Sequence, residues 1–225
     1  MTPTSRRRST RDRPAKSPLS EEAVVDAALE ILKSEGLDAV SMRRVATALD
    51  TGPASLYVYV GNREGLLRAM QDRIFAMVEL ETVDPARWRP QLHSLLDRLR
   101  GVLAAHPGIA VTAIAQPPSS EATLRLLENL LGILLAGGLA PQDAAWATDL
   151  LAMLVNHAAI EADARHADHR DQADTLYRHF TAQSPDRFPL VTAYAAQLVA
   201  GDVEERFHLA VDVVVDGMLA RAARR

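Results

Sequence analysis

Hydrophobic and polar positions around residue 50 follow the pattern of two short helices. Four apolar residues fall three or four positions apart, on one helical face: Met42, Val45, Ala46 and Leu49. Residues 50–52 interrupt this pattern, and Pro53 suits the first position of a new helix, where its missing N–H is not needed. Leu56 and Val60 then repeat four positions apart. The pattern predicts a helix-turn-helix, whose second helix enters the major groove of DNA.

A further helix is expected on each side of this unit. Upstream, Ser20 is a good N-cap, and the acidic residues that follow it are favoured by the helix dipole in the first turn. An apolar stripe follows at Val25, Ala28, Leu29 and Leu32, and Gly36 ends the helix as a C-terminal cap. Downstream, residues 62–67 open a fourth helix.

The chain from Pro85 onward also shows helical spacing, which is broken at Pro and Gly residues. Helices are expected at 87–105, 109–115, 120–136, 140–164, 171–181 and 203–222. In the helix expected at 120–136, one apolar side is expected to consist of Leu124, Leu127, Leu131 and Leu134. The sequence shows no alternation typical of strands, so the predicted fold class is all-α.

Two of the expected helices, 140–164 and 203–222, are apolar nearly all round. A helix that is apolar on every side must be covered on every side. In a domain of this size, we expect one face to pack on its own subunit and the other on a second copy. The alternative is a monomer in which both helices are fully buried. The pattern favours a homodimer.

Composition limits the classes of function. The chain has no cysteine among its 225 residues, which excludes disulfides, thiol nucleophiles and cysteine-based zinc sites. No apolar run approaches the roughly 18 residues of a membrane span, and no apolar segment follows the Arg-rich N-terminus. A soluble cytoplasmic protein with no membrane partner is therefore expected.

The net charge of −4 is unevenly distributed. Residues 1–73 hold 12 Lys and Arg against 10 Asp and Glu, whereas residues 74–225 hold 13 against 19. Positive charge is concentrated in residues 1–18, a segment too polar to fold and expected to be disordered. This basic arm either lies on DNA phosphates or in a minor groove, or is a solvated leader without a role.

The order of elements and two motifs resemble the N-terminal domain of the tetracycline-repressor (TetR) family of transcriptional regulators. The motifs are Leu56-Tyr57-x-Tyr59 and Asn62-Arg63-Glu64-x-Leu66-Leu67. The resemblance implies a three-helix DNA-binding domain at 19–75 and a helical ligand-binding and dimerisation domain at 76–225. It further implies a homodimer, joined through a four-helix bundle of the last two long helices, that reads a pseudo-palindromic operator. A small organic effector would move the two DNA-reading heads apart, as expected of a repressor.

Several positions depart from the family pattern. Asp50 stands where the family usually has Gly, although Asp tolerates the left-handed backbone that such a turn needs. Tyr59 stands where His is common, and residues 61–63 replace the more usual basic-Asn-Lys. The base preference is therefore not implied by the family.

The second helix of the unit supplies most candidate DNA contacts. Pro53 and Ala54 can touch a thymine methyl, and the Ser55 hydroxyl can donate to or accept from a base edge. Tyr57 and Tyr59 resemble positions of the family that contact the DNA backbone, where a phenol hydroxyl forms a hydrogen bond with a phosphate oxygen. The alternative for Tyr57 is packing inside the three-helix core.

Three further candidates lie outside that helix. Arg63 combines a positive charge with a helix N-terminus, which suits a phosphate. Ser41 is expected to cap the first helix of the unit and to approach a phosphate. Arg43 matches a family position that reaches into the groove, and is the candidate for reading a guanine, whereas Arg44 is expected to be a solvated charge.

An effector site is expected in the C-terminal domain. Trp146, Leu150, Met153 and His157 recur on one helix face, which suits an apolar ligand with one or two hydrogen-bonding groups. His106 is another polar residue embedded in apolar sequence. The alternative is a packed core in which the histidine is satisfied. No cofactor is expected, and the effector remains unidentified.

Other classes of function find less support. The acidic and histidine residues between 161 and 171 are possible metal ligands, but the arginines among them favour a solvated helix end, so no metal site is expected. An all-α enzyme would need paired carboxylates, a nucleophile with its base or a phosphate loop, and none is visible. A DNA-binding module regulated by a protein partner is the remaining alternative.

Overall fold

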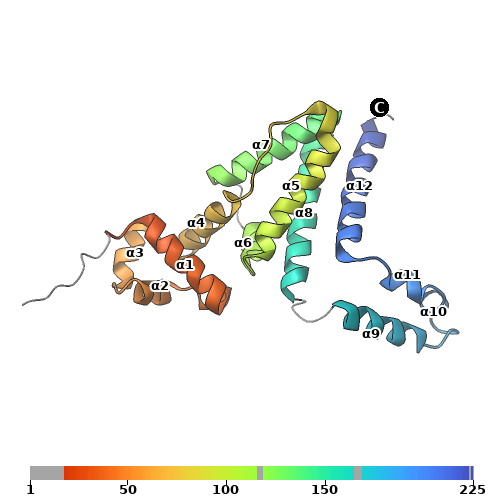
Figure 1. Cartoon of the computed structure of the whole chain (residues 1–225), viewed down its shortest axis with the longest axis horizontal. Coiled ribbons are helices and arrows are strands. Elements are labelled where there is room, and N and C mark those ends of the chain that lie inside the picture. The colour runs from red at the N-terminus through yellow and green to blue at the C-terminus, as the bar shows by residue number, and fades with distance from the viewer. Residues whose placement is uncertain (1–17, 116–118, 165–168, 223, 225) are drawn as a thin grey trace, which may run out of the picture.

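The computed structural model describes residues 18–115, 119–164, 169–222 and 224. Regular structure in these ranges is entirely helical, which confirms the all-α class (Figure 1). The molecule is elongated, with a small helical head at one end, a body of longer helices in the middle and a helical arm at the far end. None of the helices in these ranges is both long and apolar enough to cross a membrane. The predicted basic arm at residues 1–18 lies, except for Pro18, outside the described ranges.

The head, residues 18–75, is a bundle of four α-helices around one core. Its elements are α1 Glu21–Glu35, η1 Leu37–Ala39, α2 Met42–Ala48, α3 Pro53–Val60 and α4 Arg63–Phe75. The Ser20 hydroxyl caps α1 by accepting a hydrogen bond from the Ala23 N–H at 3.2 Å, as predicted. Asn62 caps α4 by accepting from the Gly65 N–H at 2.8 Å. Fully buried core residues include Val24, Ala28, Val45, Leu56, Leu66, Met70 and Ile74.

The body consists of five α-helices and a short 3-10 helix. They are η2 Pro85–Arg87, α5 Trp88–Ala104, α6 Ile109–Ala115, α7 Glu121–Ala136, α8 Pro141–Ala164 and α12 Val203–Ala222. Helices α5, α7 and α8 pack on one another, and α12 lies along α8 (Figure 1). Helix α4 of the head contacts α5, α6 and α7, so one hydrophobic core runs from the head into the body.

The arm consists of α9 His169–Thr181, α10 Pro189–Ala193 and α11 Ala195–Val199, which pack on one another. It extends away from the body between the end of α8 and the start of α12 (Figure 1). A helix at 171–181 was predicted, whereas α10 and α11 were not, because five residues are too few to show a helical period. Exposed apolar side chains on the arm include Leu176, Tyr177, Phe188, Leu190, Tyr194 and Leu198.

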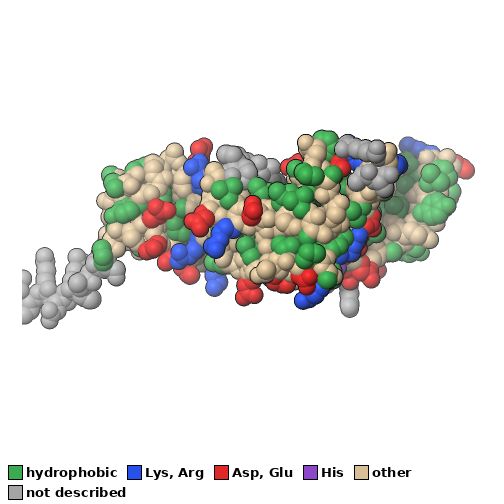
Figure 2. Space-filling view, turned by 90° about the horizontal axis from the view of Figure 1, so that it is seen from above, with side chains coloured by type: hydrophobic (Ala, Val, Ile, Leu, Met, Phe, Trp, Pro, Cys, Tyr) green, Lys and Arg blue, Asp and Glu red, His purple; other side chains and the backbone are tan. Residues whose placement is uncertain are grey.

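The buried face of helix α7 is rotated from the predicted apolar side and overlaps it only in part. Its buried residues are Leu126, Leu130, Ile133 and Leu134. Of the predicted side, Leu134 is buried and Leu131 is partly buried against the core, whereas Leu124 and Leu127 are exposed. Figure 2 shows the molecule from above the view of Figure 1, and apolar side chains lie among charged ones on this face of the body. Because α7 is apolar on two sides, helical spacing alone could not select the side that faces the core.

Charged side chains connect α5 to α12 in an arrangement that we call the α5–α12 seam. Arg89 of α5 donates to Asp212 of α12 at 2.8 Å, and His93 Nε2 lies 3.0 Å from the same carboxylate. One turn further along, His208 Nε2 of α12 lies 3.0 Å from both carboxylate oxygens of Asp97 on α5. The two histidine rings meet edge to face with their centroids 4.9 Å apart.

Acid should weaken the α5–α12 seam. Partial burial raises the pKa of the Asp212 carboxyl, but hydrogen bonds from His93 and Arg89 outweigh burial and hold the pKa below its ordinary value of 3.8. Since the folded pKa is the lower one, this stabilisation is complete above the unfolded pKa and is lost as the pH falls through the folded pKa. We expect Asp212→Asn to lower the free energy of urea unfolding by up to about 1 kcal/mol near pH ~7 and by a smaller amount near pH ~3. An equal loss at both pH values would contradict this role.

Candidate nucleic-acid interface and small-molecule site

The turn between α2 and α3 fixes the direction of the exposed helix α3. Asp50 adopts the left-handed conformation that was predicted for it, with φ of 49°. The Thr51 N–H then donates to the Ala46 carbonyl at 2.9 Å, which closes the turn on α2. Leu56 and Val60 are buried and anchor α3 to the head core by its inner face. The outer face of α3 is therefore free to meet a partner.

That outer face carries the candidate DNA contacts of α3. Pro53, Ala54 and Ser55 are all exposed at its N-terminal end. Tyr57 is 49% exposed and does not pack in the core, and Tyr59 is exposed as well. Val58, to which sequence patterns assigned no contact, is 82% exposed between them. The face offers phenol hydroxyls for phosphates and small groups for base edges.

The two adjacent arginines of α2 have different surroundings. Arg44 Nε donates to Glu35 at the end of α1 at 3.1 Å, and its Nη2 contacts the other carboxylate oxygen. These hydrogen bonds raise the pKa of Arg44 and lower that of Glu35. Arg43 is exposed, and its guanidinium has no such partner among the described residues. Of the two, Arg43 is the one available to a ligand.

Ser41 and Arg63 lie at the starts of α2 and α4. The Ser41 hydroxyl accepts a hydrogen bond from the Arg44 N–H at 3.2 Å, so it caps α2 as predicted. Arg63 is exposed, and its Nε donates to the Val40 carbonyl at 3.1 Å. This bond holds the guanidinium beside the start of α2 and leaves its Nη groups free to approach a phosphate.

Helices α3 and α4 approach each other closely at Gly65. A Cβ atom at this position would lie 2.0 Å from the carbonyl oxygen of Val60, the last residue of α3. A contact between backbone atoms leaves no side chain that could move aside. The orientation of α3 is thereby tied to the first turn of α4, a requirement that was missed because the clash depends on the fold.

The candidate effector residues are not gathered in one cavity wall. Trp146, Met153 and His157 lie exposed on α8, and Met153 is 61% exposed. The Arg221 guanidinium from α12 covers the Trp146 ring at 5.0 Å from its centroid. His106 is half-buried where α5 ends, and its Nδ1 lies 2.8 Å from the Val102 carbonyl oxygen. The α8 stripe is thus a surface in this chain.

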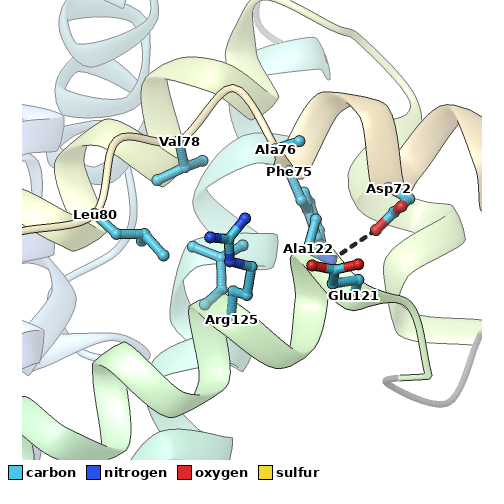
Figure 3. Close-up of a pocket in the computed structure, with 9 residues that line it drawn as sticks. Asp72, Phe75, Ala76, Val78, Leu80, Glu121, Ala122 and Arg125 are labelled. Atoms are coloured by element: carbon cyan, nitrogen blue, oxygen red, sulfur yellow. Dashed lines mark hydrogen bonds between the residues drawn. The ribbon is translucent and has the colours of Figure 1, made fainter.

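A hollow of about 460 Å³ lies where the head meets the body (Figure 3). It is lined by the end of α4, the segment after it and the first turns of α7: Asp72, Phe75, Ala76, Val78, Leu80, Glu121, Ala122, Arg125 and Leu126. The carboxylate of Asp72 accepts a hydrogen bond from the Ala122 N–H at 2.9 Å, which ties α4 to α7. These residues were not among the predicted site residues, because local spacing does not reveal a contact between positions so far apart.

Two families of domains match the chain. Residues 24–70 match the family described as "Bacterial regulatory proteins, tetR family", and residues 83–222 match "Tetracyclin repressor-like, C-terminal domain". A regulator described as "HTH-type transcriptional regulator" from Saccharopolyspora erythraea is 28% identical over 91% of this chain and 86% of its own. The "HTH-type transcriptional repressor DrrR1" of Streptomyces coeruleorubidus is 27% identical over 95% of this chain and 83% of its own.

Solved structures agree with these matches. Apo ActR from Streptomyces coelicolor superposes with a TM-score of 0.85 at 35% identity, over 93% of this chain and 99% of its own. ActR in complex with actinorhodin superposes with a TM-score of 0.84 over 91% and 97%. The similarity therefore spans the head, the body and the order of their helices.

Proposed function

The chain belongs to the TetR family of DNA-binding transcriptional regulators, and we propose that it acts as a homodimeric repressor in the cytoplasm. Two copies would bind a pseudo-palindromic operator, and a small, largely apolar effector would release them. Residues 19–75 would form the DNA-binding domain and residues 76–225 the effector and dimerisation domain, at the predicted boundaries. It involves no catalytic step and no cofactor.

The exposed outer face of α3 is the observation on which the DNA-binding mode rests. Pro53, Ala54 and Ser55 stand at the helix end that lies nearest to base edges in helix-turn-helix complexes. Phosphate contacts are assigned to Tyr57, Tyr59, Arg63 and Ser41. Arg43 is assigned to a guanine because its guanidinium is exposed and unpaired among the described residues.

The apolar surface of α8 and α12 supports the dimer. Leu209 and Val213 of α12 are 63% and 64% exposed, and Trp146 and Met153 of α8 are exposed as well. Apolar side chains in such number on two adjacent helices favour a protein interface. We therefore reassign Trp146, Met153 and His157 from the effector site to the interface between the two copies.

A small-molecule effector is supported by the similarity to ActR, which has been solved in complex with actinorhodin and with (S)-DNPA. His106 stays a candidate for contacting the effector, because it is half-buried at the start of the α5–α6 connection, next to the helices that α4 touches. Regulation by a protein partner is the alternative, and an effector that raises the melting temperature of the purified protein would exclude it as the sole input.

Selection of bound sites from random duplex DNA tests the proposal directly. The purified protein should enrich a pseudo-palindrome with two half-sites about one helical turn apart, or a multiple of it. An enriched single half-site would contradict the dimer. Recovery of no shared sequence, with binding that disappears at moderate salt, would contradict sequence-specific regulation.

Arg43→Ala and Tyr57→Phe should separate base reading from phosphate contact. We expect Arg43→Ala to relax the preference at one position of each half-site, at a cost of about 1–3 kcal/mol on the preferred base. Tyr57→Phe should weaken binding to all sequences by similar factors, because a phosphate contact does not depend on the base. Affinities for the selected site and its single-base variants check both results. An unchanged preference in Arg43→Ala would exclude this residue as a base reader.

A further inference from the structure

The hollow between α4 and α7 has two ends of opposite charge. Figure 3 shows the Arg125 guanidinium on the side of Leu80, and the carboxylates of Glu121 and Asp72 on the other side. Glu121 and Arg125 are one turn apart on α7, which places their Cβ atoms roughly 6 Å apart. Even so, no ion pair joins them, and no partner of Arg125 is found among the described residues.

Apolar groups line the space between these ends. Phe75 and Val78 are buried residues that contribute to the wall, and Leu126 closes it from α7. Two backbone donors in the first turn of α7 are already engaged, since the Ala122 N–H donates to Asp72 and the Thr123 N–H donates to Ser120. An anion in the hollow would therefore depend on Arg125 rather than on the helix N-terminus.

We propose that this hollow binds a small zwitterion whose carboxylate and ammonium are separated by a short apolar segment. The carboxylate would pair with Arg125 and the ammonium with Glu121, and the apolar segment would lie against Phe75, Val78 and Leu126. A volume of about 460 Å³ falls within the range of small-molecule sites. A ligand with only one of these two charges would leave the charged residue at the other end of the hollow without a partner.

Such a ligand would span the joint between the head and the body. Its partners come from α7 on one side, and from α4 and the segment that follows α4 on the other. It would add contacts to the hydrogen bond that the Ala122 N–H already donates to the Asp72 carboxylate across this joint. Binding at this site does not depend on the proposed operator or dimer.

Three probes of equal chain length test the charge requirement: 6-aminohexanoate, hexanoate and hexylamine. Each is titrated into the full-length protein while the methyl resonances of Val78, Leu80 and Leu126 are followed by NMR. We expect 6-aminohexanoate to shift these methyls with the lowest dissociation constant. Equal dissociation constants for the three probes would overturn the charge requirement, and the absence of shifts at these methyls would overturn the site.

Two exposed substitutions assign each charge to its residue. Arg125→Gln should weaken 6-aminohexanoate and hexanoate by about fivefold, the upper end for an ion pair that water still reaches, and leave hexylamine unchanged. Glu121→Gln should weaken 6-aminohexanoate and hexylamine by a similar factor and leave hexanoate unchanged. Glu128→Gln, an exposed carboxylate of α7 outside the hollow, is the matched control. Equal effects of Glu121→Gln and Glu128→Gln on hexylamine would overturn the assignment.

Discussion

Gly65→Ala is expected to destabilise the head and to abolish tight operator binding. The added methyl would lie 2.0 Å from the Val60 carbonyl oxygen, so α4 must shift away from the end of α3. Overpacking of this kind lowers the free energy of unfolding by about 1–3 kcal/mol. The better helix propensity of Ala offsets up to about 1 kcal/mol of this loss. We expect the free energy of urea unfolding to fall by about 2 kcal/mol. The affinity for the operator should fall by more than the decrease in the folded fraction of the protein can explain.

Gly101→Ala is the matched control, because this glycine lies inside α5 and an added Cβ would meet no atom within 4 Å. It should leave operator affinity unchanged and stabilise the protein slightly, by up to about 1 kcal/mol. If Gly65→Ala behaved like Gly101→Ala in both measurements, the close approach of α3 and α4 would not control the orientation of α3.

Val213→Asp should give a monomer that binds the operator at least about 100-fold more weakly than the parent chain. Val213 is 64% exposed on α12, so a carboxylate there is solvated in the monomer but buried without a partner in the proposed dimer. Two heads on one operator gain affinity because the second binds intramolecularly, and a monomer loses this gain. Analytical ultracentrifugation and operator titration measure the two effects together.

Val111→Asp provides the comparison for this substitution. Val111 is another exposed valine, on α6, outside the α8 and α12 surface. We expect it to leave the dimer intact, so a monomer from both variants would indicate general destabilisation rather than an interface. A dimeric Val213→Asp with parental operator affinity would place the interface elsewhere.

Helix positions in the head and body were predictable because local chemistry determines them. Ser20 and Asn62 cap their helices, Pro53 begins α3, and Gly36 ends α1 with φ of 84°. Each of these effects involves residues within a few positions of one another, so the local sequence contains the necessary information. The left-handed Asp50 was predictable for the same reason.

The choice of faces was less predictable because it depends on neighbours distant in sequence. Leu124 and Leu127 have the spacing of a core stripe on α7, yet Leu126 and Leu130 face the core instead. A stripe that includes Trp146 suggested a ligand pocket, although these residues face outward in the monomer. Periodicity defines a face but does not say whether the chain, a ligand or a second copy covers it.

The α5–α12 seam also determines the register between two helices. Asp97 faces His208, while Arg89 and His93 face Asp212, with the partners running in opposite directions along the two helices. Sliding α12 by one turn, about 5.4 Å, would bring Asp97 against Asp212 in one direction and His93 against His208 in the other. Either slide sets like charges or unbonded donors against each other. In the proposed dimer, α12 and α8 determine how the two bodies meet, and each body holds its head through α4. Residues far from DNA would therefore contribute to the spacing of half-sites that the protein accepts.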